Sequence, residues 1–149
     1  MGYGQFPDGK YFDKKGSSIM FWMKPLSIAH SQKIISFISS LVFKFTDKGM
    51  IKLFKRETNV TLPLGLWSHL TVTASSDRNP KRIFYFNGIQ RYSDDKEFND
   101  IENIDNYLGG IDSQSFIIFD ELKIFNRILS SEDILKEKEI LQPYKIKQV

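Results

Sequence analysis

Short apolar stretches recur along most of the chain, and clusters of Gly, Pro, Asn, Asp and Ser separate them. Short stretches rich in aromatic and β-branched residues and bounded by turn residues are typical of β-strands. The stretch SIMFWMK (18–24) is apolar on both faces of a pleated strand. We therefore expect both faces to be covered and Pro25 to end the strand. Further strands are expected at 33–38, 41–45, 50–54, 67–74, 82–86, 89–93, 106–111 and 115–126.

The links between these stretches carry residues that favour turns between antiparallel strands. Asn87-Gly88 lies between two apolar stretches. This pair is the strongest short signal for a β-hairpin, because both turn residues take positive φ. We therefore expect a structural role for Asn87 and Gly88. Turns are also expected at 47–49 and 63–65, and polar loops at 75–80 and 93–106.

Near the C-terminus, a strand pattern changes to a helix pattern with no glycine or proline between them. Ser130 follows the strand 115–126, and its side chain suits the N-cap of a helix. Glu132 and Asp133 suit the positive end of the helix dipole. The expected continuation is an apolar stripe of Ile134, Leu135 and Leu141, a helix end at Pro143, and an edge strand at 144–149.

Composition agrees with a single sheet-rich domain over residues 1–149. The chain has 41% hydrophobic residues and 13 Phe, which is enough to form a hydrophobic core without disulfide bonds or a structural metal. There is no Cys, which excludes disulfides, thiolate catalysis and Cys-based zinc sites and slightly favours a reducing compartment. The expected fold class is all-β, an antiparallel β-sandwich with one short C-terminal helix. Residues 1–16 are expected to be a tail or an edge strand.

Charge and hydropathy limit the classes of partner. The net charge is +3, but the basic residues are dispersed along the chain, so no nucleic-acid partner is expected. No apolar run approaches the roughly 18 residues that a membrane span needs. The N-terminus has no apolar segment typical of a signal peptide. The compartment stays open, with an intracellular location slightly favoured.

Five motifs occur in a fixed order along the chain: FWMKP (21–25), GLWSHLTVT (65–73), FYFNGIQ (84–90), YLGGID (107–112) and FDELKIFNRILSSEDI (119–134). Together they resemble the laminin G-like branch of the concanavalin A-like lectin/glucanase superfamily, over roughly residues 18 to 135. The chain is also similar to the lectin-like half of clostridial neurotoxin binding regions. The resemblance implies a jelly-roll sandwich. It leaves the function open, because the superfamily contains lectins, glycanases, adhesion modules and assembly subunits.

The carboxylates do not predict an enzyme. Glycanases of this superfamily carry carboxylates that alternate along one strand and flank the glycosidic bond, about 5–5.5 Å apart in retaining enzymes. Here Asp120 and Glu121 are adjacent, so regular alternation places them on opposite faces of the strand. The resemblance implies that most relatives have an acidic residue at the position of Asp120, irrespective of the ligand that they bind. We interpret it as a structural residue that binds neighbouring backbone or a basic side chain.

A calcium site is possible but not favoured, and no cofactor is expected. Many laminin G-like modules hold Ca²⁺ at a loop edge through Asp side chains and carbonyls. The segment that corresponds to one usual Asp position, 54–59, contains Lys55 and Arg56, which disfavour a cation there. His30 and His69 are too few for a transition-metal site, and His69 is expected to partner Trp67. Tentative binding residues are Asp94, Asp95, Asp105 and Asp112.

We therefore predict a non-catalytic interaction module that recognises a glycan or a protein surface. Trp22 and Trp67 lie in core strands and are expected to pack rather than to stack on sugars. Binding is expected at the loops 26–32, 75–81 and 93–106, because loops on rigid sandwiches carry function. The alternative is a structural subunit of a larger intracellular multiprotein assembly.

Overall fold

The computed structural model describes residues 4–5, 15–27, 33–37, 41–45, 49–53, 56–96, 106–108 and 116–140. Its side chains are described over 15–27, 49–53, 56–96 and 117–140. The elements in chain order are β1 (Gly4–Gln5), β2 (Ser17–Ser27), β3 (Lys33–Phe37), β4 (Leu41–Phe45), β5 (Met50–Leu53), β6 (Arg56–Thr61), β7 (Ser68–Ala74), β8 (Arg82–Phe86), β9 (Ile89–Asp94), β10 (Asn106–Leu108), β11 (Phe116–Phe125) and α1 (Ser131–Glu139).

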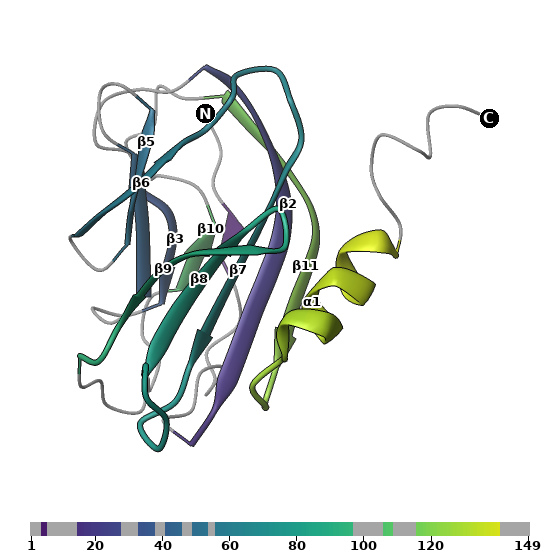
Figure 1. Cartoon of the computed structure of the whole chain (residues 1–149). Coiled ribbons are helices and arrows are strands. Elements are labelled where there is room, and N and C mark those ends of the chain that lie inside the picture. The colour runs from purple at the N-terminus through teal and green to yellow at the C-terminus, as the bar shows by residue number, and fades with distance from the viewer. Residues whose placement is uncertain are drawn as a thin grey trace.

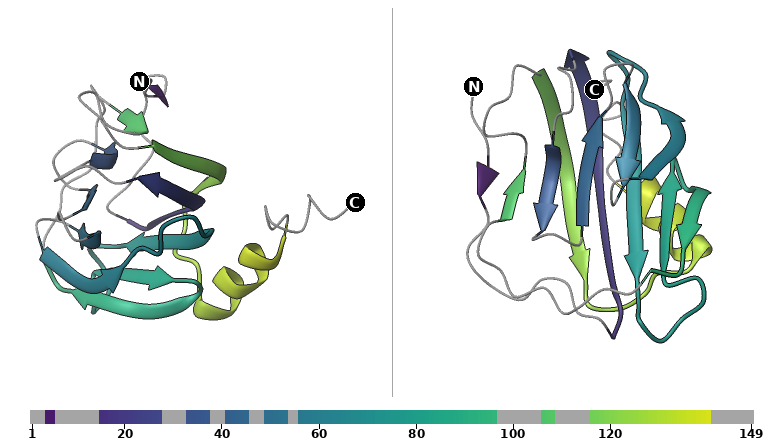
Figure 2. Two further views of the ribbon diagram at one scale, coloured as in Figure 1. Left: turned by 90° about the horizontal axis from the view of Figure 1, so that it is seen from above. Right: turned by 90° about the vertical axis from the view of Figure 1, so that its left-hand side faces the viewer.

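The strands form two antiparallel sheets that pack face to face (Figure 1). One sheet has the order β1-β10-β3-β4-β5-β6, and the other has the order β11-β2-β7-β8-β9. Figure 2 shows the two layers from above, with α1 outside the five-stranded sheet. The fold is thus an antiparallel β-sandwich with one C-terminal helix, as the sequence predicts. No helix in the described part of the chain combines the length and apolar character needed to cross a bilayer.

The inner core fills the space between the sheets. Alternate residues of β2 point into it, namely Ile19, Phe21 and Met23, and all three are fully buried. Strand β5 contributes Ile51 and Leu53. The other buried members are Val60, Leu62, Leu70, Val72, Ala74 and Phe84. This period of two identifies which face of each strand the sandwich buries.

A second, smaller apolar cluster lies on the outer face of the five-stranded sheet, beneath α1. It joins Met20 and Tyr85 of the sheet to Leu129 and Ile134, with Ile83 and Phe125 packed against it. We call this set the outer cluster. It confirms that β2 is covered on both faces, because Met20 alternates with the inner-core residues of the same strand.

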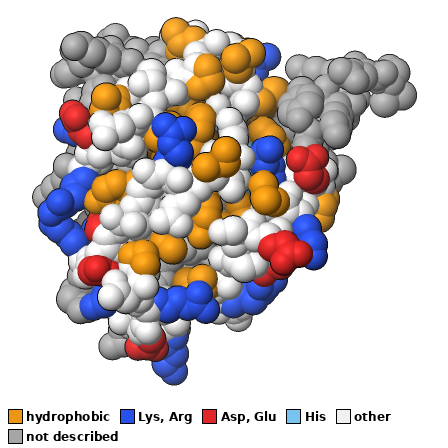
Figure 3. Space-filling model, viewed as in Figure 1, with side chains coloured by type: hydrophobic (Ala, Val, Ile, Leu, Met, Phe, Trp, Pro, Cys, Tyr) orange, Lys and Arg blue, Asp and Glu red, His pale blue; other side chains and the backbone are white. Residues whose placement is uncertain are grey.

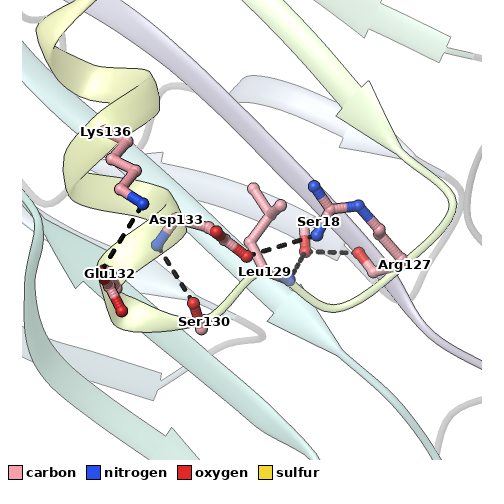
Figure 4. A network of polar contacts seen from close by, with 7 residues as sticks. All are labelled: Ser18, Arg127, Leu129, Ser130, Glu132, Asp133 and Lys136. Atoms are coloured by element: carbon pink, nitrogen blue, oxygen red, sulfur yellow. Dashed lines mark hydrogen bonds and ion pairs between the residues drawn. The ribbon is translucent and has the colours of Figure 1, made fainter.

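The junction between β11 and α1 depends on two serines (Figure 4). The Ser18 hydroxyl donates to the carbonyl of Arg127 at 2.8 Å and accepts from the backbone N of Leu129 at 3.0 Å. Ser130 is the N-cap, and its Oγ accepts from the backbone N of Asp133 at 3.1 Å. The chain can therefore turn without glycine or proline, because Ser18 satisfies the backbone groups of the turn. The expected helix start at Ser130 is confirmed.

Several elements differ from the sequence predictions. Strand β2 continues past Pro25 to Ser27, and Pro25 lies beside an irregularity in the pairing with β11. Proline is tolerated at such irregularities because no ladder hydrogen bond is required of it there. Strand β6 was not predicted. The helix ends at Glu139, with Ile140 as C-cap, so Pro143 does not end it. The predicted strand at 144–149 lies outside the described residues.

Strand β11 contains a β-bulge, which the expected regular alternation lacked. Asp120 pairs with Trp22, whereas Lys123 pairs with Met20, so β11 has one extra residue at this point. Glu121 takes a positive φ of 52° there. As a result Phe119 and Leu122 both pack against the inner core, although residues three apart lie on opposite faces of a regular strand. The regular alternation expected at Asp120 and Glu121 therefore does not occur.

Candidate functional site

The loop between β7 and β8 forms an ordered polar edge at one end of the sandwich. Its backbone closes where the N of Ser75 donates to the carbonyl of Lys81 at 2.8 Å. The Ser75 hydroxyl donates to the carbonyl of Lys15 at 3.1 Å and accepts from the N of Asp77 at 3.3 Å. The bond between Asn79 and Pro80 is cis. We call residues 75–81 together with Asp94, Asp95 and Lys96 the polar rim.

The polar rim carries exposed groups of both signs. Asp77, Arg78 and Asn79 are exposed in the loop, and Asp95 and Lys96 are exposed after β9. Figure 3 shows charged side chains of both signs at this lower end of the molecule, while hydrophobic side chains are more frequent toward the upper end. Carboxylate, amide and guanidinium groups together offer both donors and acceptors of hydrogen bonds.

A largely buried ion pair joins Asp94 of the polar rim to Arg82, the first residue of β8. Nε and Nη2 of Arg82 donate to Oδ1 and Oδ2 of Asp94, each at 2.7 Å, and both side chains are largely buried. The Tyr92 hydroxyl donates to Oδ2 at 2.7 Å, and the backbone N of Lys96 donates to Oδ1 at 3.1 Å. Both oxygens of Asp94 are therefore engaged within the protein. Such bidentate pairs fix geometry as well as charge.

Electrostatics around this ion pair reflect burial and hydrogen bonding. Burial alone would raise the pKa of Asp94, but hydrogen bonds from Arg82, Tyr92 and the Lys96 backbone hold this pKa below its usual value. Burial, together with the hydrogen bond to Asp94, raises the pKa of Tyr92 to about 12. Asp94 is therefore an ionised acceptor and Tyr92 a protonated donor at neutral pH.

Of the other three acidic residues predicted to bind, the structure describes Asp95. With the Asn79 amide oriented to donate, its nitrogen lies 3.0 Å from Oδ2 of Asp95. Asp105 and Asp112 lie outside the described residues. Within the described part of the chain, no group of three or more His, Asp or Glu side chains is arranged to hold a metal ion. An acidic binding site made by all four residues therefore stays a prediction.

The tryptophans and the Asn-Gly turn lie in packed surroundings. Trp22 is buried on the outer face of the five-stranded sheet, and Trp67 is half-buried before β7. Asn87 and Gly88 take φ values of 52° and 80°. The Asn87 Oδ1 accepts from the N of His69 at 2.8 Å, and the Asn87 N donates to the carbonyl of His69 at 2.7 Å. The turn thus holds β7 as well as joining β8 to β9.

The His69 ring contacts Trp22, whereas the expected partner Trp67 lies just before β7. The two rings meet edge to face, with centroids 5.0 Å apart and an interplanar angle of 71°. Trp22 is the cross-strand partner of His69, and directly opposed side chains approach more closely than side chains two residues apart on one strand. Burial, followed by the charges of Lys138 and Lys123, lowers the pKa of His69 to about 4. His69 is therefore neutral at neutral pH.

Asp120 binds its own backbone. Its Oδ1 accepts from the N of Glu121 at 2.9 Å, at the positive-φ residue of the bulge. Asp120 and Glu121 are both half-buried. In the sequence they stand between Phe119 and Leu122, which both pack against the inner core because of the bulge. The premise that regular alternation separates them was wrong. The hydrogen bond is consistent with the predicted structural role of Asp120.

No aromatic side chain in the described part of the chain is classed as exposed. Exposed large hydrophobic residues there are aliphatic: Leu26, Leu64, Leu66, Ile89, Ile118, Leu135 and Ile140. A flat aromatic platform of the kind on which sugar rings stack is therefore not among the described residues.

The sequence analysis did not predict the pair Arg82–Asp94, although the Asn87-Gly88 turn indicates how the first residues of β8 and β9 pair. Counting back from the Asn-Gly turn pairs Phe86 with Ile89 and Tyr85 with Gln90, which extrapolates to Arg82 opposite Ser93. A bulge after Gln90 shifts the register by one residue and places Arg82 opposite Asp94. The hairpin was predictable, but the bulge was not.

Comparison with known proteins supports this architecture. The family described as Concanavalin A-like lectin/glucanases superfamily, of laminin G type, matches residues 1–135. No curated protein matches the chain at a significant level. Among solved structures, domain 4 of AbnA, an extracellular arabinanase from Geobacillus stearothermophilus in complex with arabinotriose, is similar with a TM-score of 0.68 and 20% identity. The match covers 89% of this chain and 70% of that domain.

Receptor-binding domains of botulinum neurotoxins are similar as well. The serotype D ligand-binding domain in complex with N-acetylneuraminic acid has a TM-score of 0.63 and 22% identity, covering 85% of this chain and 37% of that one. The C/D mosaic receptor-binding domain has a TM-score of 0.64 and 22% identity, covering 86% and 37%. The chain thus spans little more than a third of these neurotoxin domains. At this identity the likeness shows the fold.

Proposed function

Since the chain belongs to the Concanavalin A-like lectin/glucanases superfamily, we propose that it is a non-catalytic module that binds a carbohydrate. The observation that carries the proposal is the likeness to an arabinanase domain whose structure holds arabinotriose. A neurotoxin ligand-binding domain, solved in complex with N-acetylneuraminic acid, contains this fold over 37% of its length. Fold alone does not identify a ligand, so the site must supply the argument for where a sugar binds.

The polar rim is the part of the described surface best suited to bind a sugar. Its framework is rigid, because Arg82 and Asp94 form a buried bidentate pair below it. The exposed Asp77, Arg78 and Asp95 above this pair can donate to and accept from sugar hydroxyls. Because hydrogen bonds already hold the backbone of this loop, binding a sugar needs to order only the side chains, which lowers the entropic cost of recognition.

The environments of two acids support a binding role over hydrolysis. A glycosidase needs two carboxyl groups that are free to reach opposite sides of a glycosidic bond. Asp94 uses both oxygens on Arg82, Tyr92 and backbone, and Asp120 uses one oxygen on the bulge. Neither arrangement leaves the carboxyl group poised for proton transfer to a sugar.

The alternative of an assembly subunit remains a prediction that the comparisons do not support. The surface feature that such a role would use is aliphatic. The N of Gly65 donates to the carbonyl of Pro25 at 2.7 Å, which brings Leu64 and Leu66 beside Leu26. All three leucines are more than half exposed.

The proposed function is tested with a glycan array that includes arabino-oligosaccharides and sialylated glycans, with calcium and with EDTA. Hits are then measured by titration calorimetry. We expect Arg78→Ala to weaken binding by about 10-fold or more, because a hydrogen bond from a charged group is worth about 1.5–3 kcal/mol. Arg91→Ala is the matched control, since Arg91 is an exposed arginine within β9, outside the rim.

The outcomes separate the function from its location. Absence of binding to every glycan in both conditions contradicts the proposed function. Binding that Arg78→Ala and Arg91→Ala leave equally unchanged contradicts the rim as the binding site but not carbohydrate binding itself.

A further inference from the structure

Helix α1 is attached to the outer face of the five-stranded sheet by few contacts. Ile134 belongs to the outer cluster, and its neighbour Leu135 lies over the turn at Gly88. A Cβ added at Gly88 would lie 2.5 Å from Cδ2 of Leu135, which shows how closely the two surfaces meet. Between the described residues of β11 and α1, Nζ of Lys123 forms an ion pair with Oε2 of Glu137 at 3.0 Å.

A neutral, buried histidine lies on the face of the sheet that carries this helix, within reach of the charge of Lys138 on α1. His69 is 2% exposed, and Asn87 binds its backbone on both sides, so the residue cannot turn outward without opening the hairpin. Its ring packs on Trp22. Within the described residues the hydrogen-bond contact of the ring is Thr71, whose Oγ1 lies 3.4 Å from Nδ1.

The charges around this ring disfavour a further proton. Lys138 on α1 and Lys123 on β11 both act on His69 as cations. Glu137 on α1 is the nearby acid, but it is engaged by Lys123. According to the strand register, Asp120 across Trp22 on β11 and Lys24 two residues along β2 also lie on this face of the sheet, and Asp120 has one oxygen bound to backbone. Glu121 follows Asp120 at the bulge, and the phenol of Tyr85 belongs to the outer cluster.

We propose that protonation of His69 in mildly acidic solution releases α1 from the sheet and uncovers the outer cluster. A proton on the ring creates a buried cation beside Lys138, and moving the helix away both hydrates the ring and removes this neighbour. The surface uncovered contains the apolar side chains of Met20 and Tyr85. The helix would thus act as a cover that acid opens, while the inner core stays closed.

The difference in the pKa of His69 between the closed and the released form determines the direction and the size of the pH dependence of α1 release. Burial and the two lysines lower the pKa of His69 to about 4, whereas a solvated histidine titrates near 6.5. Between these values the released form binds more protons than the closed form, so release becomes more favourable as the pH falls from about 6.5 toward about 4. The equilibrium constant for release rises by up to about 20-fold between pH 7 and pH 5.

Hydrogen exchange of the full chain, read by mass spectrometry, tests the proposal. A His30→Gln background leaves His69 as the one histidine of a chain that has two. Exchange of the α1 amides at pH 7 and pH 5, divided by the intrinsic rates, gives the opening constant. We expect an increase approaching 20-fold at pH 5, where most carboxylates remain ionised. Amides of β7 and β8 should show no such change.

Two variants make the test specific. His69→Gln should abolish the pH dependence of α1 exchange, because glutamine does not titrate. Lys138→Gln retains His69 and should reduce the dependence, because one cation no longer lowers the pKa of the ring. If His69→Gln does not fold, Lys138→Gln alone decides. The proposal is overturned if α1 exchange is independent of pH, if either variant keeps the full dependence, or if β7 opens together with α1.

Discussion

Two glycines with similar positive φ values differ in what surrounds them. Gly65 and Gly88 have φ values of 76° and 80°, a region that L-residues with a Cβ disfavour by roughly 1–2 kcal/mol. A Cβ at Gly65 would meet no atom within 4 Å, whereas a Cβ at Gly88 would press on Leu135. Backbone strain and packing can therefore be measured separately with matched alanine substitutions.

We expect Gly88→Ala to destabilise the protein more than Gly65→Ala does. Gly65→Ala should lower the free energy of unfolding by about 1 kcal/mol, through backbone strain alone. Gly88→Ala should cost about 1 kcal/mol more, because Leu135 or the helix must move to admit the methyl group. Urea denaturation followed by tryptophan fluorescence measures both. Equal losses would show that Leu135 moves aside without cost.

At the scale of elements, the start of α1 depends on one hydrogen bond that a neighbouring serine does not make. The Ser130 Oγ accepts from the N of Asp133, whereas Ser131 is the first helical residue. Ser130→Ala should lower the stability of the helix by about 1 kcal/mol, and Ser131→Ala should change it little. Exchange protection of the α1 amides reads both variants. A loss for Ser131→Ala as large as for Ser130→Ala would contradict the assignment of the cap.

Elements bounded by local signals were predictable from the sequence. The strands at 41–45 and 82–86 occur with the predicted limits, and the Asn-Gly turn follows the second of them. The helix start followed from Ser130. These features depend on residues adjacent in sequence, where turn chemistry and capping act. Local patterns therefore identified most strands and the fold class.

Elements that depend on distant partners were not predictable. Strand β6 is mostly polar and half exposed, and it forms by pairing with β5 at the edge of its sheet. Thr58 fixes it by donating to the carbonyl of Ile51 at 2.8 Å. The bulges in β9 and β11 likewise arise from pairing, and they decide the partner of Asp94 and the environment of Asp120. A period of two cannot reveal an extra residue in one strand.

At the scale of the whole molecule, the sandwich has two apolar layers with different roles. The inner core contains residues of both sheets, such as Phe21 and Phe84 of the five-stranded sheet and Leu53 of the six-stranded sheet. The outer cluster links one sheet to α1 through Ile134. Because few residues join the helix to the sheet, local opening of α1 should require less free energy than global unfolding. This difference is what allows a helix to open while the polar rim, at the end of the sandwich, keeps its geometry.

Truncations in the two layers should therefore have different consequences. Phe84→Ala removes a fully buried ring from the inner core and should lower the free energy of global unfolding by about 3–5 kcal/mol. Ile134→Ala should raise the opening of α1, with an effect of about 2–5 kcal/mol on helix protection and a smaller effect on the urea midpoint of the sheets. Lys136→Ala, at a helical position whose side chain is 70% exposed, is the control for Ile134. If Ile134→Ala lowers sheet and helix protection equally, helix and sandwich unfold as one unit, and release of α1 could not precede unfolding.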